Sequence, residues 1–179
     1  MHTIVSYLLL LLGIFSLITF SVLFYEANNP NRLAFKSYAA TSVASKSGEM
    51  PMAISLPSIN KSLAIYPSKI TGKTWQTTTN GVSYLTSSPL PGSTGNSIIY
   101  GHNWASIFGD LIKVKPGDPI KIIFQNGKEK LFKVQFTTMV NPNQTQILNP
   151  SPDARLTLYT CTGFLDSKRF VVTAVLATK

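Results

Sequence analysis

The sequence Thr157-Leu-Tyr-Thr-Cys161 lies in an apolar, β-prone run and ends in the only cysteine of a 179-residue chain. Eight residues later, Arg169 begins a second run of this kind, FVVTAVL, over residues 170–176. Two strands joined by a short polar loop would lie side by side and hold the thiol next to the guanidinium. The chain has two histidines, and His2 lies at the N-terminus ahead of a hydrophobic segment, so His102 is the candidate base. The pattern therefore predicts a pair of strands that carries a Cys/His/Arg site.

The chain around this stretch is divided into short apolar runs by Pro, Gly, Asn and Ser. Asn126-Gly127, between two of the runs, predicts a hairpin turn. Residues 130–136 alternate polar with apolar side chains, which is typical of a strand with one face in water. A helical turn or two is indicated over residues 106–112. Eight short strands with so few helices predict an all-β domain, a closed or nearly closed β-barrel. The predicted strands are 52–56, 62–66, 81–85, 97–100, 119–124, 130–138, 156–160 and 170–177.

The N-terminal segment, residues 4–25, contains 22 residues without a charge. A helix of this length would reach ~33 Å, enough to cross a bilayer core of ~30 Å. A buried helix would normally show a polar face, and a cleaved signal peptide would have a shorter apolar region with its cleavage site close behind. The small residues at 39–44 lie too far downstream for such a site. We therefore predict an uncleaved transmembrane anchor over residues 1–25, a linker over 26–50 and one domain over 51–179.

The charges around the anchor do not favour an exported domain. No Lys or Arg precedes the segment, whereas Arg32 and Lys36 follow it. The positive-inside rule would keep the basic flank in the cytoplasm.

The chain is basic, with a net charge of +9, of which +8 falls within the predicted domain. A basic balance suits nucleic acid, anionic lipid or an acidic polymer. The lysines are scattered and no nucleic-acid-binding motif is present, so nucleic acid is the weakest of these partners. A single cysteine excludes an internal disulfide and a multi-cysteine metal site.

Each candidate site residue has an ordinary interpretation when taken alone. A lone cysteine is most often a small buried apolar side chain. His102 could be a hydrogen-bonded loop histidine, and Arg169 could be a surface residue at the start of a strand. The occurrence of all three together, in these settings, favours a site.

The motifs around these residues resemble those of the sortases, whose signature is TLxTC, a loop, and then an Arg with a Val-rich strand. The similarity continues upstream in the same order and covers roughly residues 51–179. It implies an eight-stranded sortase-type β-barrel on a single-pass membrane anchor. It also implies that the barrel lies outside the cytoplasm, which is opposite to what the charges flanking the anchor favour. The matching upstream motifs are Pro91-Gly92, Gly95-Asn96, IIYGHN at 98–103, Phe108-Gly-Asp-Leu111 and Pro116-Gly-Asp118.

The resemblance also implies roles for the site residues. Cys161 would be the nucleophile, His102 the acid/base and Arg169 the group that stabilises the substrate. A free thiol with a pKa near ~8.5 is mostly protonated at pH 7, and nearby cations lower that pKa. Attack on a carbonyl creates an oxyanion that needs prepared donors, which Arg169 and the backbone N–H of Thr162 could supply. His102 is the only candidate to protonate the departing amine.

The implied substrates are surface proteins with a C-terminal LPxTG-type sorting signal, cut between Thr and Gly. The acyl group would pass to an amine such as a cell-wall precursor or a pilin lysine, without a cofactor. Acidic residues are few and dispersed, so the calcium site of some sortases has no clear counterpart. The short loop at 162–168 and the Pro/Asn-rich segment at 140–154, with no evident helix, leave the subclass and the exact motif open.

Two alternative functions make different demands on the sequence. An L,D-transpeptidase would carry an arginine two residues after the cysteine, where this chain has Gly163. A non-catalytic, membrane-tethered β-barrel that binds anionic cell-wall polymer would fit the +8 domain. The intact set of site residues counts against this second alternative.

Overall fold

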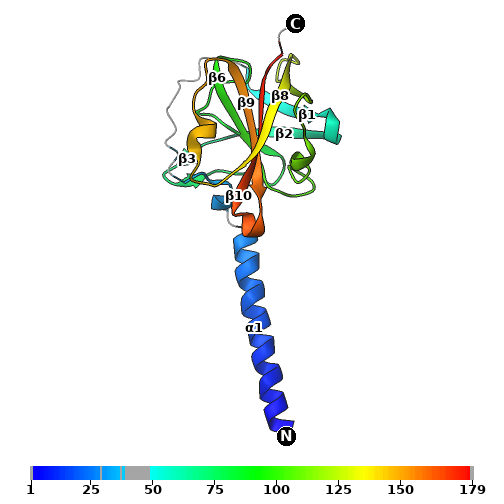
Figure 1. Ribbon diagram of the computed structural model, residues 1–179, viewed down its shortest axis with the longest axis vertical. Coiled ribbons are helices and arrows are strands. Elements are labelled where there is room, and N and C mark those ends of the chain that lie inside the picture. Colours follow the sequence, from blue (N-terminus) through cyan, green and yellow to red (C-terminus); the bar gives the residue numbers. More distant parts are fainter. Residues whose placement is uncertain (1, 29, 37, 39–48, 178–179) are drawn as a thin grey trace.

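The structure, a computed structural model, describes residues 2–28, 30–36, 38 and 49–177 (Figure 1). Eight strands close into a barrel in the order β1-β2-β5-β6-β9-β10-β8-β7. All eight predicted strands are confirmed, with ends shifted by a few residues. They are β1 (Pro51–Leu56), β2 (Lys61–Ser68), β5 (Val82–Leu85), β6 (Gly95–Tyr100), β7 (Pro119–Phe124), β8 (Glu129–Val140), β9 (Ala154–Thr162) and β10 (Lys168–Leu176).

Strand pairing is antiparallel except for β2 with β5 and β6 with β9. Asn126-Gly127 forms the predicted turn between β7 and β8, with Gly127 at φ 79°, a left-handed conformation that glycine adopts without strain. The connection from β2 to β5 carries a small hairpin, β3 (Ile70–Thr71) and β4 (Thr74–Trp75), which was not predicted. Strands of two residues are too short to show any periodicity in the sequence.

The remaining elements are short 3₁₀ helices. The helical turns predicted over 106–112 occur as hydrogen-bonded turns that lead into η3. Segment 140–154, where no helix was evident, contains a single 3₁₀ turn, η4. The 3₁₀ helices are η1 (Pro30–Leu33), η2 (Pro57–Ile59), η3 (Leu111–Lys113), η4 (Thr145–Leu148) and η5 (Phe164–Asp166).

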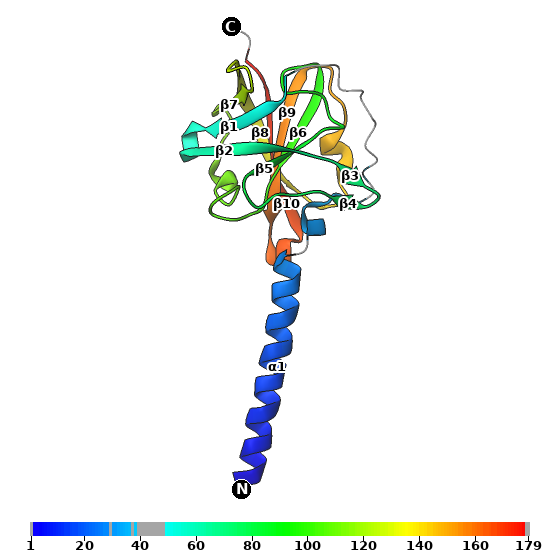
Figure 2. The ribbon, with the colours of Figure 1, turned by 180° about the vertical axis from the view of Figure 1, so that it is seen from behind.

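One long helix, α1 (His2–Asn28), extends away from the barrel (Figures 1 and 2). Its stretch Thr3–Tyr25 is long and apolar enough to cross a membrane, and the barrel covers none of it. The helix meets the barrel at the end where the loop between β9 and β10 lies, as both views show. The predicted membrane segment is thus one continuous helix that ends beside the predicted site.

The alternation of side chains along β9 separates two hydrophobic clusters. Leu156 and Leu158 belong to the larger cluster, which fills the barrel. Tyr159 and Cys161 belong to a second cluster on the other face of the strand. Because successive residues of a strand point to opposite faces, both faces of β9 are apolar, and the cysteine lies outside the barrel core.

Candidate active site

Strand register brings Cys161 and Arg169 together. In the antiparallel pair of β9 with β10, Cys161 lies opposite Arg169, and Tyr159 lies opposite Val171. Residues two apart share a face of the sheet, so the thiol and the guanidinium project on the side of the second cluster. This is the arrangement that the sequence predicted for the two residues.

His102 reaches the same level from the neighbouring strand. In the parallel pair of β6 with β9, Tyr100 lies opposite Tyr159, so two further residues bring His102 level with Cys161. The chain between them is fixed because the Thr160 hydroxyl donates to the Gly101 carbonyl at 2.8 Å. The His102 ring stacks on Trp104, with ring centroids 4.5 Å apart. Within the part of the chain that the structure describes, no hydrogen bond joins His102 to the cysteine or the arginine.

Arg169 is buried, with 3% of its surface exposed. One terminal nitrogen donates to the carbonyls of Asp166 and Lys168, each at 2.9 Å. The other donates to the carbonyl of Ala34, also at 2.9 Å. Its Nε has no hydrogen-bond partner among the described residues. The guanidinium thus joins the loop after Cys161 to residue 34, and Arg169 also lines the groove described below.

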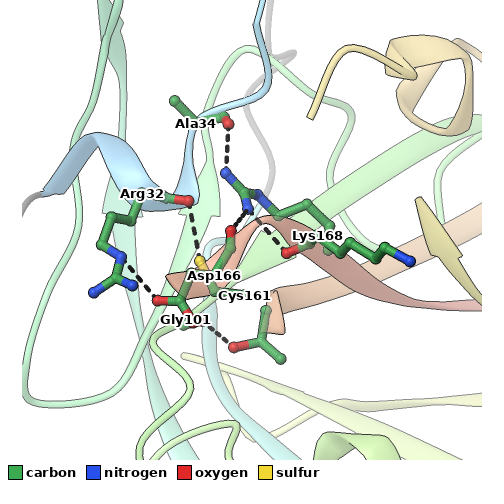
Figure 3. A network of polar contacts seen from close by, with 8 residues as sticks. Arg32, Ala34, Gly101, Cys161, Asp166 and Lys168 are labelled. Carbon is green, nitrogen blue, oxygen red and sulfur yellow. Dashed lines mark hydrogen bonds and ion pairs between the residues drawn. The ribbon is translucent and has the colours of Figure 1, made fainter. Parts of the chain in front are cut away.

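Residues 32–36, which we call the strap, lie across this site (Figure 3). Three successive strap carbonyls accept hydrogen bonds from site residues. The Arg32 carbonyl lies 3.0 Å from Cys161 Sγ, the Leu33 carbonyl accepts from the Tyr159 hydroxyl at 3.1 Å, and the Ala34 carbonyl accepts from Arg169. A peptide segment of the chain therefore occupies the space in front of the thiol.

Strap side chains complete the second hydrophobic cluster. Leu33 and Phe35 are buried in it, and the Phe35 ring packs edge-on against Tyr159, with centroids 5.0 Å apart. Phe35 also lies against Trp75 of β4, at 6.4 Å, so the unpredicted hairpin forms one wall. The Lys36 backbone N–H donates to the Pro142 carbonyl at 2.7 Å, which ties the strap to the loop between β8 and β9.

The sequence had indicated a linker for residues 26–50, of which 29, 37 and 39–48 lie outside the described residues. It did not indicate that the strap would enter the site. The available signal was the alternation in Arg32-Leu-Ala-Phe-Lys36, where two large apolar residues stand two apart in a polar setting. That pattern is typical of an extended segment with one buried face.

Burial shifts the pKa of both titratable site residues. Burial raises the pKa of the Cys161 thiol to about 11, an effect that the nearby Arg169 only partly offsets. Burial also lowers the pKa of His102 below its ordinary value. With the strap in place, the pair is therefore a neutral thiol and a neutral imidazole at pH 7.

A groove of about 850 Å³ opens beside the strap. Its walls come from the strap, the β3–β4 hairpin, Pro142 and the loop between β9 and β10. Thr162, the candidate backbone donor, is the last residue of β9, opposite Lys168. Among the described residues, no group of three His, Cys, Asp or Glu side chains is arranged to hold a metal ion.

Comparisons of this sequence with known proteins find sortases. The family model of the sortase domain matches residues 54–177. Sortase A of Bacillus anthracis is 28% identical over 123 residues, which are 66% of this chain and 56% of that protein. The chain thus matches little more than half the length of this relative.

Solved structures extend the similarity to the fold. Sortase C-1 from Actinomyces oris is 32% identical, with a TM-score of 0.60 over 71% of this chain and 73% of that one. A lid mutant of sortase A from Corynebacterium diphtheriae is 28% identical, with a TM-score of 0.63 over 92% of this chain and 96% of that one. The predicted eight-stranded barrel of this type is confirmed.

Proposed function

Because the chain belongs to the sortase family, we propose that it is a membrane-anchored cysteine transpeptidase that acts on C-terminal sorting signals of the LPxTG type. The observation that carries the proposal is the pairing of Cys161 with Arg169 across β9 and β10, with His102 level with them at the end of β6. All three stand at the positions that match the sortase motifs.

In the proposed reaction, the Cys161 thiol first gives its proton to His102, and the resulting thiolate attacks the carbonyl carbon of the Thr–Gly bond. The oxyanion accepts hydrogen bonds from Arg169 and from the Thr162 backbone N–H. The C–N bond breaks as His102 gives a proton to the departing glycine amine, which leaves a thioester on Cys161. An incoming amine then attacks the thioester, loses its proton to His102 and forms a new amide bond, so the thiol is regenerated.

The strap must move before this reaction can begin. It lies where a substrate carbonyl would have to meet the thiol, and burial holds the pKa of Cys161 at about 11. Burial of Leu33 and Phe35 contributes about 3–6 kcal/mol, and the four hydrogen bonds of the strap contribute about 2–6 kcal/mol. Ordering five residues costs about 5–10 kcal/mol. These opposing free energies nearly cancel, so a bound substrate could displace the strap.

We further propose that α1 anchors the protein as a single-pass span with the barrel outside the cytoplasm. In support, Thr3–Tyr25 carries no charge and stands clear of the barrel. The acyl acceptor would be an amine of a cell-wall precursor or a pilin-like lysine.

The test uses the full chain in lipid nanodiscs, a quenched LPxTG-type peptide and a panel of amines. Intact-mass spectrometry should detect an acyl adduct on Cys161 that an amine discharges. Cys161→Ala is the control that should form no adduct. Leu33→Ala with Phe35→Ala should form the adduct faster, because the strap is weakened.

A peptide library that yields no adduct in either the native chain or the strap variant would contradict the proposal. That result would favour the non-catalytic barrel that binds anionic wall polymer. Retention of the full chain on a wall-polymer column, released by salt, would then be the supporting measurement.

A further inference from the structure

The loop between β9 and β10 presents two large apolar side chains to solvent. Phe164 is 84% exposed and its neighbour Leu165 is 52% exposed. Leu165 and Asp166 both have positive φ, 49° and 56°, a conformation that is strained for residues other than glycine. The loop is thus folded in a strained form that keeps apolar side chains outside the core.

The position of this loop is set by the helix below it. Both ribbon views show η5 directly against the end of α1 (Figures 1 and 2). Arg32 Nε forms an ion pair with Asp166 at 2.9 Å, and Arg32 is four residues beyond Asn28, the last residue of α1. Four residues span at most ~14 Å even when fully extended. The Arg32 backbone therefore lies within that reach of the end of α1, and the ion pair holds the loop beside it.

We propose that Phe164 and its neighbour Leu165, which also lines the groove, insert into the lipid headgroup interface and seat the groove against the membrane surface. The proposal rests on the proposed anchoring by α1. The polar layer on each side of a bilayer is ~5–7 Å thick, and both views place the loop against the end of the helix that would enter it. Exposed apolar side chains beside a spanning helix lower their free energy when they enter this layer.

Charge around the loop is compatible with a lipid surface. Lys168, which follows the loop, and Lys36 of the strap are both exposed, and basic residues near the headgroups are attracted to anionic lipids. The one carboxylate of the loop, Asp166, is paired with Arg32, so its charge is offset. An apolar tip with a basic flank is the composition that interfacial segments use.

This arrangement would select substrates by location as well as by sequence. A groove whose mouth lies at the membrane surface is readily reached by a peptide segment that emerges from the same bilayer. An acceptor amine carried on a lipid would meet the thioester in the same layer. The partner proposed for this loop is therefore an anionic lipid surface.

The first experiment measures insertion directly and does not depend on catalysis. In a Cys161→Ala background, which removes the only native thiol, Phe164→Cys and Leu165→Cys are spin-labelled in the full chain. The chain is placed in nanodiscs of phosphatidylcholine and phosphatidylglycerol. Leu131→Cys is the matched control, because Leu131 is a leucine with 46% exposure near the C-terminal end of the barrel, far from α1.

We expect labels at 164 and 165 to be accessible to oxygen and protected from a water-soluble nickel chelate, by about tenfold relative to 131. Equal accessibility to the nickel chelate at all three positions would overturn the proposal. So would protection from both reagents, which would mean that the loop packs against protein. An enzyme that proved inactive would leave this result intact, so failure of the proposed function is distinguishable.

A second experiment separates membrane seating from peptide binding. Phe164→Ser in nanodiscs should slow the cleavage of a membrane-tethered sorting peptide by about tenfold and leave a soluble peptide unaffected. Leu131→Ser should change neither rate. An equal loss with both peptides would show that Phe164 contacts the substrate itself, which would overturn the proposal.

Discussion

The two hydrophobic clusters of the barrel differ in where their residues come from. The cluster inside the barrel uses residues of the strands and their loops, from Ile54 to Ala174. The cluster around Cys161 includes Leu33 and Phe35, which reach it from the segment after α1. The first cluster therefore belongs to the folded domain itself. The second is completed by a segment whose departure would leave the barrel closed and expose the site.

The comparison predicts very different costs for two leucine truncations. Leu158→Ala, in the barrel, should lower the free energy of unfolding by about 2–5 kcal/mol because it opens a cavity in a packed core. Leu33→Ala removes the same atoms from a buried leucine, yet should cost less than about 1 kcal/mol. Because the strap can detach locally, the loss in the free energy of unfolding cannot exceed the free energy of opening the strap.

Denaturant unfolding of both variants, followed by circular dichroism in the same detergent, measures this difference. Equal losses for the two leucines would mean that the strap is an integral part of the barrel core. The interpretation that the strap can leave the second cluster without unfolding the barrel would then be wrong.

The strands and the pairing of Cys161 with Arg169 could be predicted from the sequence, whereas the strap and the β3–β4 wall could not. The strands were predictable because Asn126-Gly127 and the apolar runs act locally. Cys161 and Arg169 were predictable as neighbours because a short loop joins their strands. The strap could not be predicted, because its contact with Cys161 crosses more than a hundred residues and depends on the path of the chain after α1. The β3–β4 wall was missed because two-residue strands have no periodicity.

Arg169 joins the domain to the strap, since its guanidinium donates to carbonyls of the loop after Cys161 and to the Ala34 carbonyl. Arg169→Lys should lower kcat by about 10²–10³-fold, the usual cost of a lost oxyanion donor. An ammonium group cannot reproduce the several directed donors of a guanidinium. Near-normal turnover of a sorting peptide by this variant would contradict the role given to the arginine.

The second cluster also controls the thiol, so weakening the strap should lower the pKa of Cys161. Thiolates, not thiols, react with alkylating agents, so the native rate should keep rising as the pH approaches about 11. Leu33→Ala with Phe35→Ala relieves the burial that raises this pKa, and the rise should move to lower pH. At pH 8, we expect alkylation of Cys161 to be about tenfold faster or more, because one pKa unit is tenfold in thiolate.

Iodoacetamide labelling followed by mass spectrometry across pH 6–11 measures both profiles. Leu131→Ala is the control, since it removes an exposed leucine at the other end of the barrel. Superimposable profiles for the native and strap variants would show that burial by the strap does not determine the pKa of the thiol.

The smallest effect expected concerns the 2.9 Å ion pair between Arg32 and Asp166, which joins the strap to the loop after Cys161. A partly exposed pair of this kind contributes about 0.2–1 kcal/mol, so it should bias the strap without locking it. Hydrogen exchange of the Lys36 amide, which donates to Pro142, reports strap opening independently of the pKa of the thiol. Arg32→Gln and Asp166→Asn should each speed that exchange up to about fivefold. The double variant should be no faster than the single ones, because both substitutions remove the same interaction.

Additive effects in this cycle would mean that the two charges act on the strap separately. Insensitivity of the native exchange rate to salt would argue against an electrostatic contribution.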